Sequence, residues 1–301
     1  MIKTVKVTNY LGESITLELG RPEKSGLLVR EISGLGPSKA NVNFSDLSTG
    51  DGSIYNSARV TSRNIVFTLD ILSQPDVETM RQLTYKYFPI KKKIKLLFTT
   101  DNRVCEIYGY VETNEPNIFS KTQQTQISIL CPDPYFYSVG DYTTIFYGVE
   151  SLFEFPFSNE SLVTNLLEFG EIQNKTENNI YYQGDADVGV VIEIRATGVA
   201  TDVAIYNMNT REVMKIDSAK LLALTGSGIV MGDEIYISTV RNDKYVLLFR
   251  DGEYINILNT LEKRTDWFQL VKGDNIFAYT AEFGLTNLQF KVKNKIVYEG
   301  I

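Results

Sequence analysis

The chain has 301 residues, 43% of them hydrophobic and 12% aromatic, so it is long enough to bury more than one core. Its net charge of -7 argues against nucleic-acid binding as its main function. It contains no histidine, which excludes the commonest general base, the commonest zinc ligand and any Ser-His-Asp arrangement.

Two features bear on where the protein is made. No apolar run reaches the length that crosses a membrane, and the start Met1–Val5 reads as a strand and not as a signal peptide. The only cysteines, Cys105 and Cys131, lie in strand-like runs. We therefore expect two buried thiols in a protein made in a reducing cytoplasm, with no disulfide scaffold.

The N-terminal part reads as short strands separated by glycine, proline and polar turns. The expected strands before the first long polar stretch are Val5–Val7, Ile15–Leu19, Leu27–Ile32 and Val42–Phe44.

A polar segment, Ser45–Ser57, follows and predicts a hairpin. Asp51 and Gly52 lie at its centre, and this pair suits a type I′ turn with positive φ at both positions. The run Ala58–Leu72 then alternates apolar and polar residues, which predicts one long strand beginning near Arg59 and Arg63. On this pattern alone an ordinary surface hairpin fits as well as a projecting arm.

One helix is expected in the N-terminal part, at Pro75–Phe88. Ser73 or Gln74 would lie near its cap, and Pro75 suits a first turn. Apolar residues recur on one face at helical spacing and predict a side packed on a sheet, namely Val77, Met80, Leu83 and Tyr87. The basic run Lys91–Lys93 after it reads as a solvated loop or a guard on a strand edge.

Three more strands, Ile94–Thr99, Val104–Val111 and Thr125–Cys131, complete this part, with a polar loop at Glu112–Gln123. Pro132 and Pro134 then stop the pattern, since proline gives no N–H to a ladder. We therefore expect two domains, 1–137 and 138–301.

The C-terminal part has many short strands with turn residues between them and no helix, which predicts an antiparallel sandwich with the topology of a jelly roll. Asp251 and Gly252 predict a second type I′ hairpin. The stretches Ser158–Asn165 and Asp217–Gly232 read as loops. The expected strands are Tyr181–Tyr182, Val188–Arg195, Val203–Asn207, Val213–Ile216, Glu234–Thr239, Tyr245–Arg250, Tyr254–Leu258, Ala278–Phe283 and Leu288–Val292.

The order of these features resembles the distal tail proteins of long-tailed phages and prophages. The strand that ends in Cys131-Pro132-Asp133-Pro134 and the following Tyr135–Tyr137 resembles their domain junction. The Asp-Gly loop before Arg63–Ile71 and the single helix resemble their first domain. The run Val188–Gly198, and the order from Tyr245 through Trp267 to Asn275, resemble their galectin-like or carbohydrate-module-like second domain.

This resemblance implies a mainly β protein and a structural function without a reaction. The first domain would be sandwich-like, with one helix and an extended hairpin arm, and subunits would close into a ring, a hexamer in the family. The ring would join the tail tube protein to a tail-associated hub or lysin protein and to receptor-binding or baseplate proteins, at a virion tail tip assembled in the host cytoplasm. The arm residues expected at the subunit interface are Leu47, Asp51, Gly52, Ile54, Tyr55, Arg59 and Arg63.

Two other functions remain in view. The second domain could be a carbohydrate-binding module that grips host cell-wall glycan, with Trp267 as a stacking platform, although we favour Trp267 as a core anchor beside Leu270. A glycan hydrolase needs only two carboxylates, for which Asp185 with Asp187, Asp233 with Glu234, and Asp251 with Glu253 are candidates.

Metal and cofactor sites are not expected. Asp46 with Asp51, or Asp185 with Asp187, could supply oxygen ligands to Ca²⁺, but no twelve-residue loop with a closing Glu is present. Thr225–Gly228 lacks the lysine of a phosphate loop and reads as a flexible turn. We expect no cofactor, no metal, no nucleic acid and no membrane insertion.

Overall fold

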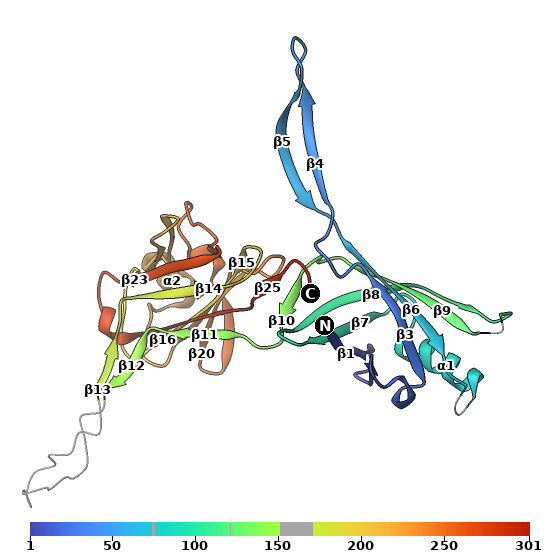
Figure 1. The fold of residues 1–301 in the computed structure, drawn as a ribbon. Coiled ribbons are helices and arrows are strands. Elements are labelled where there is room, and N and C mark those ends of the chain that lie inside the picture. The colour runs from blue at the N-terminus through green and yellow to red at the C-terminus, as the bar shows by residue number, and fades with distance from the viewer. Residues whose placement is uncertain (74–75, 121, 151–170) are drawn as a thin grey trace, which may run out of the picture. The chain divides into compact units, whose positions relative to one another are not determined.

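The computed structural model describes residues 1–73, 76–120, 122–150 and 171–301, which form a mainly β protein of two compact units (Figure 1). Unit 1 comprises Met1–Val139 together with Val297–Ile301, and unit 2 comprises Gly140–Ile296. The predicted boundary after residue 137 falls close to this division. The return of the last five residues to unit 1 was not predicted.

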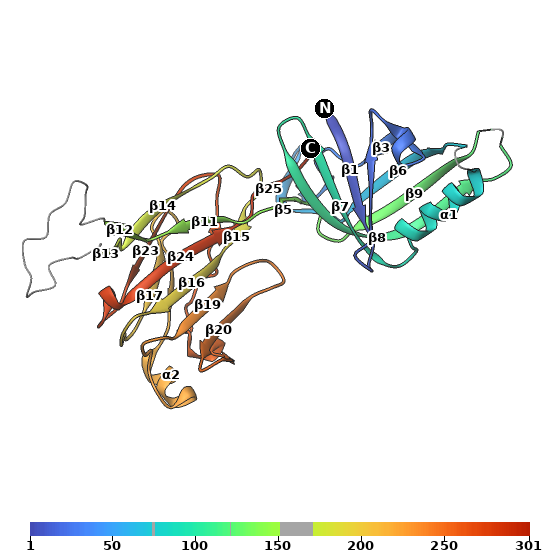
Figure 2. The same ribbon diagram turned by 90° about the horizontal axis from the view of Figure 1, so that it is seen from below.

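Unit 1 is built on one antiparallel sheet in the order β2-β1-β7-β8-β9-β6-β3, with β10 pairing β8 and β25 (Figure 2). A short 3₁₀ turn, η1 (Pro22–Lys24), connects β2 to β3. The strands are β1 (Ile2–Thr8), β2 (Ser14–Glu18), β3 (Leu27–Ser33), β6 (Arg63–Ile71), β7 (Lys93–Thr100), β8 (Val104–Asn117), β9 (Gln124–Cys131), β10 (Phe136–Ser138) and β25 (Val297–Tyr298).

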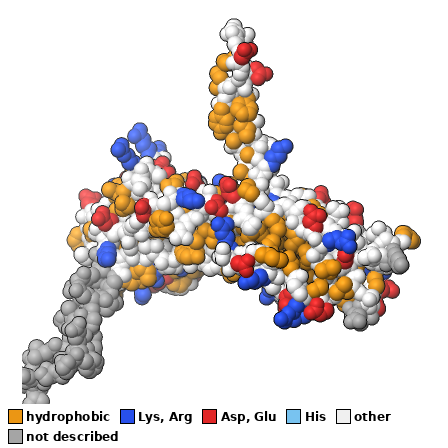
Figure 3. Space-filling model, viewed as in Figure 1, with side chains coloured by type: hydrophobic (Ala, Val, Ile, Leu, Met, Phe, Trp, Pro, Cys, Tyr) orange, Lys and Arg blue, Asp and Glu red, His pale blue; other side chains and the backbone are white. Residues whose placement is uncertain are grey.

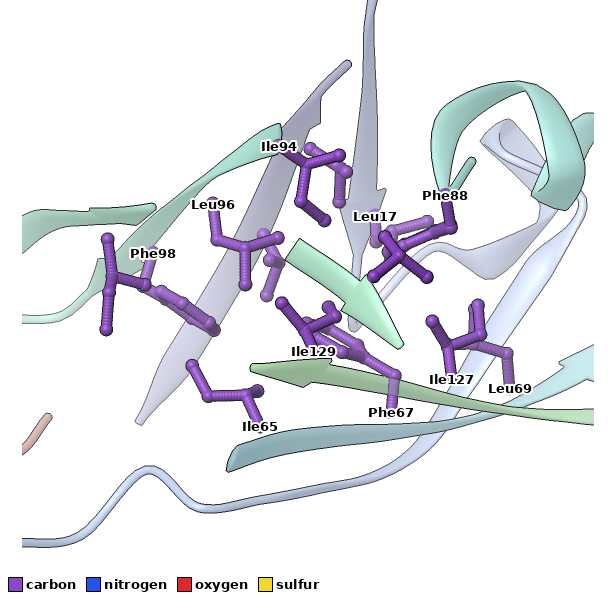
Figure 4. Packing of buried hydrophobic residues seen from close by; sticks show 14 of the residues in the cluster. Leu17, Ile65, Phe67, Leu69, Phe88, Ile94, Leu96, Phe98, Ile127 and Ile129 are labelled. Carbon is purple, nitrogen blue, oxygen red and sulfur yellow. The ribbon is translucent and has the colours of Figure 1, made fainter. Parts of the chain in front are cut away.

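Alternation along each strand buries one face of this sheet. On β6, Ile65, Phe67 and Leu69 are fully buried, as the apolar alternation predicts (Figure 4). The rings of Phe67 on β6 and Phe98 on β7 lie 6.5 Å apart, although β8 and β9 separate these strands in the sheet. The sheet therefore curves around its own core.

Helix α1 (Val77–Tyr87) packs against this core, and Met80 is its most buried apolar residue. Its N-cap is Asp76, whose carboxylate accepts from the Thr79 backbone N–H at 2.8 Å. The cap expected at Ser73 or Gln74 is therefore wrong, because the helix begins at Val77 and not at Pro75. Gln74 and Pro75 lie outside the described residues.

Two predicted boundaries in unit 1 are also wrong. The run Ala58–Leu72 is not one strand: β5 (Ser53–Val60) ends, Thr61 and Ser62 intervene, and β6 begins at Arg63. The polar residues after Val111 continue β8 to Asn117, because a strand with one exposed face tolerates polar residues there.

Unit 2 is a sandwich with sheet orders β11-β24-β16-β19-β20-β21 and β14-β23-β17-β18. Tyr279 of β23 and Phe290 of β24 belong to different sheets and stack 3.7 Å apart, so the two sheets pack face to face. The two-stranded ladders β12-β13 and β15-β22 flank them.

The elements of unit 2 have the following bounds: β11 (Tyr142–Ile145), β12 (Tyr147–Glu150), β13 (Glu171–Asn174), β14 (Glu177–Tyr182), β15 (Val188–Gly189), β16 (Val191–Ala196), β17 (Ala204–Asn207), β18 (Glu212–Lys215), α2 (Ser218–Thr225), β19 (Glu234–Ser238), β20 (Tyr245–Arg250), β21 (Glu253–Asn256), η2 (Leu258–Thr260), β22 (Gln269–Leu270), β23 (Gly273–Thr280), η3 (Leu285–Asn287) and β24 (Leu288–Asn294).

Helix α2 overturns the prediction that this part contains no helix. Asp217 caps it by accepting from the Lys220 N–H at 3.0 Å, and Gly226 ends it with φ +79°. The predicted turn at Thr225–Gly228 is therefore a helix C-cap.

Between β20 and β21, Asp251 and Gly252 both have positive φ, which confirms the predicted type I′ hairpin. The loop expected at Ser158–Asn165 lies outside the described residues.

Candidate functional site: an exposed hairpin arm

The hairpin of β4 (Ala40–Asp46) and β5 (Ser53–Val60) projects from unit 1 as a two-stranded ribbon (Figure 1). Every residue of both strands is exposed, so no other described part of the chain covers either face. The arm is longer than the predicted Ser45–Ser57. An isolated ribbon of two strands is at best marginally stable in water.

The two faces of the arm differ in chemistry. Val42 pairs with Ala58 and Phe44 pairs with Tyr55, which places these residues with Ala40 and Val60 on one apolar face (Figure 3). The rings of Phe44 and Tyr55 meet edge to face at 6.3 Å, yet their residues remain 58% and 59% exposed.

The opposite face is polar and holds the ribbon together. Asn43 donates from Nδ2 to Ser57 Oγ at 3.0 Å, and Asn56 donates to Ser45 Oγ at 2.6 Å. A bulge between Asn43 and Phe44 shifts the register by one residue, and the apolar residues on either side of it still share a face.

The tip is not the type I′ turn predicted for Asp51 and Gly52. Only Gly52 has positive φ, at +103°, and the strands are joined by the longer loop Leu47–Gly52, closed by a bond from Leu47 N–H to Gly52 O. A hairpin forms here, but the Asp-Gly pair lies at the end of the loop and does not form its two-residue turn.

Arg63 lies at the root of the arm and not on it. It is 3% exposed, and its guanidinium donates to four backbone carbonyls, those of Gly34, Gly36, Pro134 and Glu299, at 2.5–2.6 Å. It also stacks over the Phe136 ring at 4.5 Å. Burial lowers the pKa of this guanidinium. The prediction that Arg63 contributes to the arm interface is therefore wrong, because its side chain is occupied within unit 1.

The other six predicted arm residues lie on the exposed hairpin, as expected, but they do not all share a face. Tyr55 belongs to the apolar face, Ile54 and Arg59 lie on the polar one, and Leu47, Asp51 and Gly52 form the tip. Three other residues of the apolar face, Val42, Phe44 and Val60, were not predicted at the interface, although the alternation of 40–46 and 58–60 could have identified them.

A second feature is the outer face of the six-stranded sheet in unit 2. A hollow of about 150 Å³ there is lined by side chains from β12, β16, β19 and β24, including Tyr147, Glu193, Arg195 and Tyr236. The Tyr236 hydroxyl donates to Glu234 Oε2 at 2.5 Å, and this bond raises the pKa of Tyr236.

Aromatic rings continue along this face beside the hollow. The ring of Tyr254 lies 6.1 Å from that of Tyr236 and 4.8 Å from that of Phe249, and Tyr254 is exposed. Such a row of tyrosines over a sheet offers flat surfaces on which a sugar ring can stack.

Trp267 lies elsewhere and is half-buried, with the Lys244 ammonium 4.9 Å from its ring centre. The residue that fills the core is its neighbour Phe268, which is fully buried and 5.5 Å from the Phe277 ring. Trp267 itself is only partly covered, so its assignment as a core anchor or as a sugar platform stays a prediction.

Several of the carboxylates considered for hydrolysis have structural roles, and Asp185 forms an ion pair with Lys272 at 3.7 Å. Asp233 is buried and accepts from Arg250 Nε at 2.8 Å and from Nη2 at 2.5 Å, which ties it to the structure. Its neighbour Glu234 faces the other side of β19. Asp251 forms the hairpin turn.

No group of three or more metal-ligating carboxylates or thiols occurs among the described residues. No helix in the described ranges is long and apolar enough to cross a membrane.

No protein-family model matches the chain, and no curated protein matches it in sequence. Among solved structures it is similar to the crystal structure of Dit (gp 19.1) of phage SPP1, described as a paradigm of the hub adsorption apparatus in phages that infect Gram-positive bacteria. That match has a TM-score of 0.64 at 12% identity and covers 97% of this chain and 99% of that one. The likeness to distal tail proteins is therefore confirmed at the level of fold.

Two structures of the phage P2 baseplate in its activated conformation, with Ca and with Sr, are also similar. They cover 98% and 97% of this chain, and the same shares of their own chains, at 11% and 12% identity. Their TM-scores are 0.46 and 0.45, which is too low to support an argument.

Proposed function

We propose that this chain is a structural tail-tip protein of a long-tailed phage or prophage, whose copies close into a ring. The observation that carries the proposal is the arm, which holds Val42, Phe44 and Tyr55 on one exposed face. A soluble protein rarely leaves so extended an apolar ribbon bare, and a second copy is the partner always present at equal concentration.

The likeness of fold to a phage hub protein supports this function and suggests its partners. The ring, a hexamer by resemblance, would bind the tail tube protein on one side. The other side, or unit 2, would hold a tail-associated hub or lysin protein and the receptor-binding or baseplate proteins. Such a protein assembles in the host cytoplasm, works at the virion tail tip and catalyses no reaction.

Native mass spectrometry of the full chain tests this proposal. We expect a closed oligomer at high protein concentration, or on addition of a tail tube partner. Replacing residues 44–56 by Asn-Gly, so that a type I′ turn joins Asn43 to Ser57, should leave both units folded and abolish the oligomer. A monomer under every condition, with and without the partner, would overturn the ring. A ring formed by the shortened variant would show that the arm does not close it.

The aromatic face of unit 2 favours one second candidate, a carbohydrate-binding function toward cell-wall glycan. Stacking of a sugar on Tyr254 predicts that Tyr254→Ala loses roughly tenfold in affinity for cell-wall polysaccharide. Trp267→Ala is the matched variant. If Trp267 were the sugar-stacking platform, this variant would lose the affinity for polysaccharide instead. Absence of binding by the full chain would remove this candidate.

A further inference from the structure

The outer face of the unit 1 sheet carries an exposed row that crosses three adjacent strands. In the register of β7, β8 and β9, Lys93 lies opposite Tyr110, and Tyr110 lies opposite Leu130. Tyr110 is 45% exposed and Leu130 37%, and Tyr108 is exposed beside them. This row, called here the receiving row, runs from an apolar residue through an aromatic one to a positive charge.

The ammonium group of Lys93, at the end of the receiving row, has no carboxylate partner among the described residues. Lys95, the next lysine on the same face, pairs at 2.6 Å with Glu106, whose side chain is only 4% exposed. Lys93 instead lies over the Tyr108 ring, with Nζ 4.7 Å from its centre, and forms no ion pair with any described residue. The lysine run 91–93 is thus only in part the solvated loop predicted from the sequence, because Lys93 begins a central strand.

The apolar face of the arm presents a matching row of opposite charge. Val42, Phe44 and Asp46 alternate along β4 and so point to one side, in the order apolar, aromatic, acid. At about 3.4 Å per residue this row is about 14 Å long, against about 10 Å for the receiving row at about 4.8 Å between strands. The flexible lysine side chain spans the difference.

We propose that the receiving row Leu130–Tyr110–Lys93 is where the arm of a neighbouring copy docks. Val42 would then lie against Leu130 and Phe44 against Tyr110, and Asp46 would pair with Lys93. The inference rests on the proposed ring and adds the surface on which the arm is held. A contact between two different surfaces of identical copies is head-to-tail, the kind that closes into a ring.

Photo-crosslinking locates the docking surface directly. A full chain carrying p-benzoylphenylalanine in place of Phe44 is mixed with ¹⁵N-labelled copies, assembled and irradiated. We expect crosslinks that join a labelled to an unlabelled peptide and fall on Tyr108, Tyr110 or Leu130. The same probe at Ile54, on the polar face, should give few. Crosslinks to another surface of the partner copy would overturn the receiving row and leave the ring intact.

A charge exchange provides the second test. Lys93→Glu and Asp46→Lys should each weaken self-association about tenfold, and the double variant should recover most of that loss. Lys263→Glu, an equal change of charge at an exposed site in unit 2, should have little effect. Rings that tolerate both single changes, or a double variant no better than either, would overturn the pairing. Failure of the unmodified chain to assemble would instead count against the proposed function.

Discussion

Arg63 ties together parts of unit 1 that are far apart in the sequence. Its four carbonyl partners come from the segment before the arm, from the domain junction and from the C-terminal tail. A guanidinium can serve all of them because its N–H groups fork in one plane, whereas a lysine ammonium is a point charge. The residue therefore anchors the root of the arm without belonging to its surface.

We expect Arg63→Lys to lower the free energy of unfolding of unit 1 by about 3–5 kcal/mol, since several buried carbonyls lose charged hydrogen bonds. Arg59→Lys, on the exposed arm, is the control and should change it by less than about 0.5 kcal/mol. Denaturant unfolding measures both. Equal stability of the two variants would mean that water replaces the guanidinium at no cost.

The two cysteines provide a probe of unit 1. Burial raises the pKa of Cys105 and of Cys131 to about 12. At pH 8 the reactive thiolate is then on the order of 10⁻⁴ of each thiol, because the pKa lies about four units above the pH. We expect no reaction with Ellman's reagent in the folded protein and two equivalents on unfolding in guanidinium. Rapid labelling of either thiol in the native protein would contradict this burial.

At the scale of elements, α1 shows that a helical stripe does not bury all its members equally. Met80 is buried, whereas Leu83 is half-buried and lines a groove of about 400 Å³ beside β2. The apolar spacing predicted the packed face, but the depth of each residue depends on the sheet beneath it.

Met80→Ala should therefore cost about 2–4 kcal/mol of unit 1 stability, and Leu83→Ala only about 1–2 kcal/mol, because the groove already admits water. Urea unfolding monitored by thiol exposure measures both variants. A larger loss of unfolding free energy for Leu83→Ala than for Met80→Ala would show that Leu83 is the more deeply buried of the two side chains.

At the scale of the whole molecule, the chain leaves unit 1 after Val139 and returns to it at Val297. There β25 pairs with β10, Ile301 N–H bonds to Leu35 O at 3.1 Å, and Glu299 supplies a carbonyl to Arg63. Unit 1 is thus completed by residues distant in sequence.

Ending the chain after Ile296 should lower the stability of unit 1 by about 2–4 kcal/mol through these lost bonds and leave unit 2 nearly unchanged. The two units can be followed separately in one sample, because Cys105 and Cys131 lie in unit 1 and the single tryptophan, Trp267, lies in unit 2. Thiol exposure and tryptophan fluorescence should give different midpoints. An unchanged midpoint for thiol exposure would mean that residues 297–301 contribute nothing to the stability of unit 1.

Features that depend on local periodicity could be predicted from the amino-acid sequence. Alternation in Ile65–Ile71 predicted a half-buried strand, and Asp251-Gly252 predicted a hairpin. These signals lie within a few residues of one another, so no distant contact is needed to recognise them.

Which surfaces are covered could not be predicted from the sequence and is seen in the folded chain. Arg63 and Arg59 look alike in the sequence, yet one is buried among carbonyls and the other is exposed. The residues of the arm alternate as those of a core strand do, but nothing in the described chain packs on them. Burial depends on what the rest of the chain brings to each face, and that is set by contacts between residues far apart in sequence.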